Sequence, residues 1–143
     1  MTEQVDFYIL PEARESAKLQ VACKITLKAF DQGLRVYLRT QDLDQSAELD
    51  RMLWVFSQSS FIPHVITEGA ETAWEDYPVQ LGINPDPANA AEVLINLSDS
   101  VPEQFQYYPR IADLVGADEK AGARARYRHY RDRGIEPNTH NLG

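Results

Sequence analysis

Short runs of β-branched and aromatic residues alternate with helical patterns along most of the chain, and this alternation constrains the fold more than any other feature of the sequence. Strands that are connected through helices pair in parallel, because the crossover brings the chain back to the end of the sheet at which it began. The pattern therefore predicts an α/β fold with a mainly parallel sheet. With 143 residues, the chain is expected to form a single three-layer α/β/α domain over residues 1–143.

The clearest strand pattern is Glu92–Leu97, a nearly continuous apolar run of the kind that is buried on both faces of a sheet. Further strands are expected at Val5–Leu10, Leu34–Leu38, His64–Ile66, Val79–Leu81 and Ile111–Val115. Helices are expected over the apolar face from Leu19 to Phe30, which ends near Gly33, and at Asp42–Phe56, Val101–Tyr108 and Asp118–Arg133. The inward residues expected for the second helix are Leu43, Ala47, Leu49, Met52 and Leu53.

Charge is distributed unevenly along the chain. The net charge is -8, and no Lys or Arg occurs from Met52 to Pro109. Six basic residues instead gather near the C-terminus, at Lys120, Arg124, Arg126, Arg128, Arg131 and Arg133. Nucleic-acid binding of the ordinary kind needs many phosphate contacts over a broad positive surface, which this distribution does not provide. A short cationic strip is better suited to a small anionic partner such as an acidic peptide tail.

The last predicted helix places most of these charges on one side. At about 100° per residue, one arc contains Lys120, Arg124, Tyr127, Arg128 and Arg131. Arg126, His129 and Arg133 point elsewhere. We expect Val115 and Tyr127 to wall a small apolar pocket beside the charges, which would suit an acidic peptide with one hydrophobic anchor. The alternative is a solvated basic face that interacts favourably with the helix dipole.

A second candidate surface lies at the end of the second predicted helix. Trp54 and Phe61 are aromatic residues at a helix-to-loop corner beside Pro63, where they could anchor a protein partner or pack in the core. For the neighbouring His64, a structural or interface role is favoured over metal binding.

The usual signatures of chemistry are absent from the sequence. The turn after the first strand, Pro11–Arg14, has no glycine, so we expect a nucleotide-binding-like core without a phosphate-binding loop. Neither metal-ligand spacing of the histidines nor a nucleophile-elbow motif is present, and Cys23 is the single cysteine. We therefore expect no catalytic residue, no metal ion and no cofactor. No apolar run approaches the length of a membrane span, which favours a cytoplasmic protein without membrane contact.

Three segments together resemble one known family across nearly the whole chain. They are Asp6–Leu10, the stretch from Leu53 to His64, and Ala123–Arg131 with Asn138 and Thr139. In this order they are similar to the chi subunits of bacterial DNA polymerase III holoenzyme. Two stretches match that pattern less closely, namely Thr67–Tyr77 and Gly116–Asp118.

The resemblance implies a small α/β accessory protein without nucleotide chemistry or catalysis. Such a protein joins the clamp loader through the psi subunit, as a monomer in a heterodimer with psi, and holds the C-terminal tail of single-stranded DNA-binding protein. It would then meet nucleic acid mainly indirectly. Tail recognition is implied at Val115, Lys120, Arg124, Tyr127, Arg128 and Thr139, and psi contact at Trp54 and Phe61.

Two alternatives remain open from the sequence. The chain could bind single-stranded DNA directly, with aromatic residues beside basic ones at Tyr127, Arg128, Tyr130 and Arg131. It could also be a degenerate nucleotide-utilising enzyme, which only the expected fold suggests.

Overall fold

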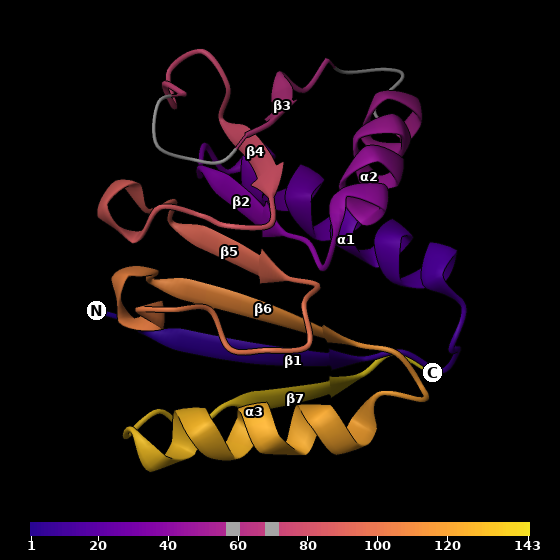
Figure 1. The fold of residues 1–143 in the computed structure, drawn as a ribbon, viewed down its shortest axis with the longest axis vertical. Helices are drawn as coiled ribbons and strands as arrows, with labels where there is room; N and C mark the ends of the chain where they lie inside the picture. The colour runs from indigo at the N-terminus through magenta and orange to yellow at the C-terminus, as the bar shows by residue number, and fades with distance from the viewer. Residues whose placement is uncertain (57–60, 68–71) are drawn as a thin grey trace.

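The computed structural model describes residues 1–56, 61–67 and 72–143. Its centre is a seven-stranded sheet with the order β3-β4-β2-β5-β6-β1-β7, in which every paired neighbour is parallel (Figure 1). The strands are β1 (Gln4–Ile9), β2 (Val36–Arg39), β3 (His64–Ile66), β4 (Val79–Gly82), β5 (Val93–Asn96), β6 (Arg110–Val115) and β7 (Asn138–Asn141). The predicted parallel α/β class is confirmed.

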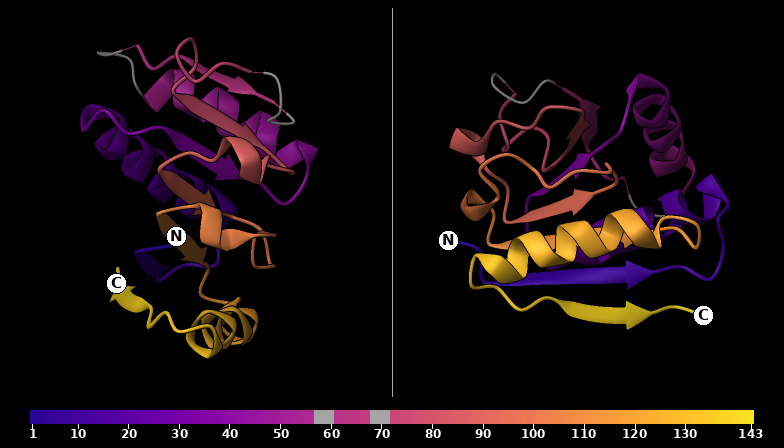
Figure 2. Two further views of the ribbon diagram at one scale, coloured as in Figure 1. Left: turned by 90° about the vertical axis from the view of Figure 1, so that its left-hand side faces the viewer. Right: turned by 60° about the horizontal axis from the view of Figure 1, so that its bottom comes forward.

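Helices cover both faces of this sheet (Figure 2). They are α1 (Glu15–Asp31), α2 (Leu43–Phe56) and α3 (Lys120–Asp132), with 3-10 turns η1 (Pro87–Asn89) and η2 (Phe105–Tyr107). One hydrophobic cluster joins α1 and α2 to one face, and a second joins α3 and η2 to the other. The arrangement is therefore the expected three-layer α/β/α.

The alternation of side chains along the central strands explains the two clusters. On β6, Ala112 and Leu114 belong to the cluster under α1 and α2, whereas Ile111 and Val115 belong to the cluster under α3. Successive residues of a strand point to opposite faces, so a strand covered on both sides must be apolar throughout. β5 largely meets this requirement, since all four of its residues are buried and three of them, Val93, Leu94 and Ile95, are apolar. The exception, Asn96, donates hydrogen bonds to Asp113 and to the carbonyl oxygen of Ser100.

Two residues predicted to face inward from α2 are exposed instead. Leu43 is the first residue of the helix and is 66% exposed, and Ala47 is also exposed. The buried positions are Ser46, Leu49 and Leu53. These three are spaced by three and four residues and so share one face of the helix, from which Ala47 is turned by about 100°.

Two other elements differ from the sequence-based expectation. The helix expected at Val101–Tyr108 is only the short turn η2, which follows Gln104 with its left-handed backbone (φ 50°). The strand β7 was not predicted, because Asn138–Asn141 is polar and its side chains are all exposed. It pairs with β1 from Asp6 to Ile9 and forms one edge of the sheet.

The strand order places the two predicted surfaces far apart. β3 and β7 are the opposite edges of the sheet. Helix α2 packs on β3 and β4, whereas α3 lies beside β7 and β1 in both figures. A partner bound at α2 would therefore be separated from a partner bound at α3 by the full width of the sheet.

Candidate functional site

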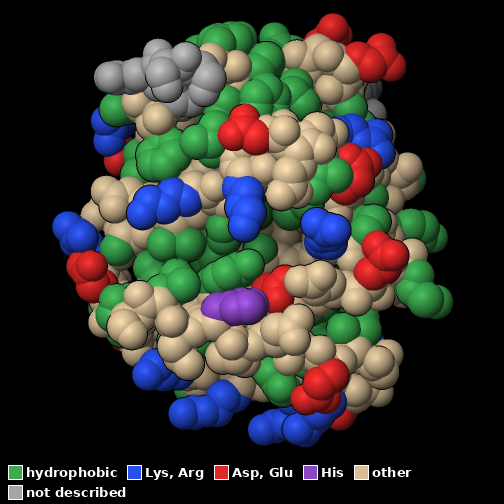
Figure 3. All heavy atoms as spheres, turned by 180° about the vertical axis from the view of Figure 1, so that it is seen from behind, with side chains coloured by type: hydrophobic (Ala, Val, Ile, Leu, Met, Phe, Trp, Pro, Cys, Tyr) green, Lys and Arg blue, Asp and Glu red, His purple; other side chains and the backbone are tan. Residues whose placement is uncertain are grey.

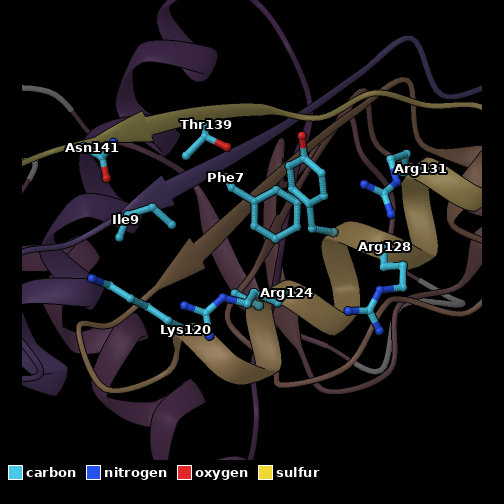
Figure 4. Close-up of a pocket in the computed structure, with 10 residues that line it drawn as sticks. Phe7, Ile9, Lys120, Arg124, Arg128, Arg131, Thr139 and Asn141 are labelled. Carbon is cyan, nitrogen blue, oxygen red and sulfur yellow. The ribbon is translucent and has the colours of Figure 1, made fainter.

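A cavity of about 430 Å³ lies between α3 and the sheet edge formed by β1 and β7 (Figure 4). It is lined by Phe7, Ile9, Lys120, Ala123, Arg124, Tyr127, Arg128, Arg131, Thr139 and Asn141. The cations lie on α3, while Thr139 and Asn141 project from β7 on the opposite side. The cavity is thus a groove with one cationic wall and one polar wall.

The floor of the groove is apolar and well packed. Phe7 is buried on β1, with its ring centroid 5.6 Å from that of Tyr127 and 6.1 Å from that of Tyr130. Ala123 is buried on α3 and leaves space beside these rings. An apolar side chain that enters the groove would therefore meet carbon atoms without displacing the charged groups above them.

The cationic wall is available to an anion. Lys120, Arg124, Arg128 and Arg131 are all exposed, and within the described residues none of them forms an ion pair. Viewed from behind, Lys and Arg side chains lie along the bottom of the molecule, where α3 and β7 lie, and also across the middle of this face (Figure 3). Unpaired charges beside an apolar floor provide both attraction and an anchoring place for an acidic peptide.

Arg126 has a different role, although it lies on the same helix. Its Nε donates to Asp113 Oδ2 and its Nη2 donates to Asp113 Oδ1, both at 2.9 Å. Its Nη1 donates to the carbonyl oxygen of Asp99 at 3.1 Å. Because both charged side chains are buried, Arg126 fastens α3 to β6 and adds no charge to the groove.

Tyr127 holds the segment that leads to β7. Its hydroxyl donates to Glu136 Oε1 at 3.1 Å, and its oxygen also lies 3.4 Å from the carbonyl oxygen of Pro137. The hydrogen bond to Glu136 raises the pKa of the Tyr127 phenol above its ordinary value. Tyr127 therefore ties α3, which forms the cationic wall, to the segment that leads into β7, which forms the polar wall. Its ring packs against Phe7 at the same time.

The polar wall, formed by β7, is held in place by contacts on the face of the sheet opposite to α3. Asn138 Nδ2 and His140 Nε2 lie 3.2 and 2.9 Å from Asp6 Oδ1, and the His140 ring stacks on Tyr8 at 4.8 Å. Residues alternate along a strand, so the contacts of Asn138 and His140 direct the intervening Thr139 into the groove. These polar contacts compensate for the lack of apolar side chains in β7.

Five of the six residues predicted for tail recognition meet in this groove: Lys120, Arg124, Tyr127, Arg128 and Thr139. The expectation that Val115 walls the pocket is wrong, since its side chain is fully buried beneath α3. Phe7 and Ile9 of β1 supply the apolar surface in its place. These two residues could have been found from their alternation with Asp6 and Tyr8, but only if the face covered by α3 had been known.

The second predicted surface is exposed, which resolves the choice between core and surface. Trp54 is 50% exposed and Phe61 is 66% exposed, with ring centroids 5.5 Å apart. Trp54 also lies 4.5 Å from the ring of His64. His64 itself is buried, and its Nδ1 lies 2.8 Å from the carbonyl oxygen of Ile62, which agrees with the predicted structural role. Val55 and Phe56 extend the exposed apolar surface along the end of α2.

A second cavity, of about 590 Å³, opens near the carboxyl ends of β2 and β5, where α/β proteins of similar topology bind nucleotides. Its acidic lining residues are Glu15, Asp42, Asp44, Glu48, Asp99 and Glu119. Among the described residues of this lining, Lys18 is the only cation, and it is already paired with Glu119. A polyphosphate would meet repulsion here, which argues against nucleotide binding.

The proposed stacking of Tyr130 on single-stranded DNA is also contradicted. Its ring is fully buried, in edge-on contact with Phe105 at 4.9 Å, so it cannot receive a base. In the part of the chain that the structure describes, no cluster of His, Cys, Asp and Glu could hold a metal ion. No described helix combines the length and the apolar character that a membrane crossing requires.

Comparison with known proteins decides the family. A family model described as DNA polymerase III chi subunit, HolC, matches residues 1–138. The chain belongs to this chi-subunit family. It is therefore a replication accessory subunit of DNA polymerase III, as the resemblance implied.

Individual chi subunits match over most of their length. The DNA polymerase III subunit chi of Pseudomonas aeruginosa is 40% identical over 141 residues, covering 97% of this chain and 96% of the relative. The Haemophilus influenzae subunit chi is 27% identical over 146 residues and all of both chains. The Escherichia coli subunit chi is 29% identical over 127 residues, covering 87% of this chain and 85% of the relative.

Proposed function

We propose that this chi-family protein is a non-catalytic adaptor. At the α3 groove it holds the acidic C-terminal tail of single-stranded DNA-binding protein, and at Trp54 and Phe61 it binds the psi subunit of the clamp loader. Its contact with nucleic acid is then mainly indirect, because the bound partner meets the strand. The net charge of -8 agrees with indirect contact, because a negatively charged protein is repelled by the phosphates of nucleic acid.

The observation that carries the proposal is the composition of the groove. Four cations that form no ion pair with any described residue stand over an apolar floor made by Phe7, Ile9 and Ala123. A terminal carboxylate is a planar anion that an Arg guanidinium can hold with two parallel hydrogen bonds. A peptide that ends in an aromatic residue presents this carboxylate beside an apolar ring, and preceding acidic residues would meet Arg128 and Arg131.

The proposed psi surface would bind through apolar contacts and not through charge. Exposed aromatic rings contribute large apolar areas, and clustered aromatic residues are typical anchors of protein interfaces. Trp54 and Phe61 contact one another while each remains at least half exposed. A partner that covers both rings would remove this apolar area from water, which stabilises the complex.

The tail half of the proposal can be tested by calorimetric titration with an acidic peptide that ends in Phe. Arg124→Ala should weaken binding by about 1.5–3 kcal/mol, the range for a charge-assisted hydrogen bond. Arg133→Ala is the matched control, because Arg133 immediately follows α3, is exposed and lies outside the groove.

The comparison between the two variants decides the outcome. If both substitutions weaken binding equally, the peptide is attracted only by the general charge of this end of the molecule. If Arg124→Ala binds as tightly as the unsubstituted protein and has a normal circular dichroism spectrum, the groove is not the tail site.

A further inference from the structure

The strand β7 has one edge with which no described strand pairs. It pairs only with β1 and ends the sheet. In a parallel ladder, the amide groups of alternate residues point toward the same neighbouring strand. The N–H of Leu142 donates to the carbonyl oxygen of Ile9 at 2.9 Å, so His140, two residues earlier, also directs its N–H toward β1. The N–H groups of Thr139 and Asn141 therefore point away from the sheet.

The same two residues line the groove with their side chains. Their outward amides lie along the free edge of the sheet, next to the groove wall that β7 forms. Natural proteins usually protect such an edge with Lys, Pro, a bulge or a covering segment. The sequence of β7, Asn-Thr-His-Asn, includes neither Lys nor Pro. This edge is open to a further strand.

Dimensions and charge indicate what kind of chain would fit. From Lys120 to Arg131 the helix rises eleven residues, or about 16 Å. An extended peptide advances about 3.3 Å per residue, so about five residues would span the cationic row. The occupant that matches this length and this charge is an extended acidic peptide.

We infer that the acidic tail binds by adding an eighth strand to the sheet, beside β7. This inference rests on the proposed function and specifies its binding mode. The backbone of the peptide pairs with Thr139 and Asn141. Its side chains alternate, so that every second one enters the groove and the others face solvent. The main chain then supplies affinity, and the apolar floor and the cations supply selectivity.

The direction of the added strand follows from where the cations of α3 lie relative to the two ends of β7. In the groove, Lys120 and Arg124 lie toward the Asn141 end of β7, and Arg131 lies toward its beginning (Figure 4). If Arg124 holds the terminal carboxylate, the acidic residues before it lie toward Arg128 and Arg131. The peptide therefore runs in the same direction as β7, which preserves the parallel arrangement of the sheet.

Amide hydrogen exchange measured by NMR tests the inference on the unmodified protein. With saturating acidic, Phe-ended peptide, exchange of the Thr139 and Asn141 amides should slow at least tenfold. The His140 amide already faces β1, so its exchange should change much less and serves as the internal control. Exchange of Thr139 and Asn141 at the rate of the free protein, while the peptide is bound, would overturn strand addition.

Peptides with a single N-methyl group provide an independent test that leaves the protein unchanged. Methylation should weaken binding about fivefold or more at alternate positions, where a net hydrogen bond of about 1 kcal/mol is lost. Methylation of the intervening amides, which face solvent, is the matched control and should have little effect. Equal effects at all positions would contradict strand addition, although dependence on Arg124 would preserve the proposed function. If the unmodified peptide does not bind at all, the proposed function fails and the inference fails with it.

Discussion

Lys18 Nζ lies 3.0 Å from Glu119 Oε1, and this ion pair joins the first turn of α1 to the residue that precedes α3. The Lys18 side chain is 7% exposed, whereas that of Glu119 is 43% exposed. The same carboxylate oxygen accepts the N–H of Gly116 at 2.7 Å. Glu119 thus fixes the turn between β6 and α3, from which the cationic wall of the groove begins.

The pH dependence of this contact can be predicted from the pKa of Glu119. Burial alone would raise that pKa, but the Gly116 N–H and the Lys18 ammonium outweigh it and lower the pKa below its ordinary value of 4.5. The ionised Glu119 carboxylate therefore stabilises the folded protein above pH 4.5. This stabilisation is lost as the pH falls through the lowered pKa that Glu119 has in the folded state. Urea unfolding of the protein and of Glu119→Gln should show a stability difference that shrinks with acidification through this window. A difference that stays constant down to pH 2 would contradict the assignment.

The buried pair of Arg126 and Asp113 predicts a strong effect on stability. Arg126→Ala leaves the Asp113 carboxylate buried without its partner, which should cost about 3–5 kcal/mol. Arg124→Ala removes the same charge from an exposed position of the same helix and should change the unfolding free energy by no more than about 0.5 kcal/mol. Chemical denaturation of both variants at pH 7 makes the comparison. Similar stabilities would mean that Arg126 does not fasten α3.

Lys120 should contribute to tail binding mainly as a point charge. Its ammonium is exposed and flexible, so Lys120→Ala should weaken peptide binding less than Arg124→Ala does. The loss should also fade between about 50 mM and 500 mM salt, because exposed charges are screened. Peptide titrations over this salt range provide the measurement. A loss that does not vary with salt would indicate a close, desolvated contact instead.

The two proposed binding surfaces should behave independently. Phe61→Ala should weaken psi binding by about 2 kcal/mol or more, if the ring is a central anchor, and leave tail binding unchanged. Arg124→Ala should show the reverse, since sites on opposite edges of the sheet share no partners and their effects add. Each variant is titrated with psi and with the peptide. Impairment of both interactions by one substitution in a folded protein would replace the two-site adaptor with a single shared surface.

Cys23 provides a probe of global opening. It is the single cysteine of the chain, it is fully buried on α1, and burial raises the pKa of its thiol to about 12. The thiolate is the reactive form, so the folded protein should resist a thiol reagent at pH 8 and react only when it unfolds. Labelling followed by mass spectrometry should therefore become faster in the destabilised Arg126→Ala variant. Rapid labelling of the unsubstituted protein would show that α1 opens locally.

Much of this fold could be predicted from local patterns. The strong apolar run of β5 and the helical period of α1 and α2 each depend on neighbouring residues alone. The helical arc of α3 also separated Arg126 from the groove cations correctly. What it could not provide was the partner of Arg126, because Asp113 is recognisable only after β6 is placed beneath the helix.

The groove illustrates the limit more clearly. β7 is polar and becomes a strand only because it pairs with β1, more than 130 positions earlier in the chain. Without that pairing, Thr139 has no defined place, and Asn141 gives no local signal at all. Val115 was misplaced for a related reason: the alternation of β6 predicts two faces but does not say that α3 closes over this residue.

The opposite placement of the edge strands β3 and β7 has a mechanical consequence. Hydrogen-bonded strands lie about 4.8 Å apart, so six intervals put these edges about 29 Å from one another. Because hydrogen bonds set each interval, the width of the sheet cannot stretch or shorten appreciably. The protein is therefore a rigid spacer about 3 nm wide, and molecules attached at its two edges are coupled in position without having to touch.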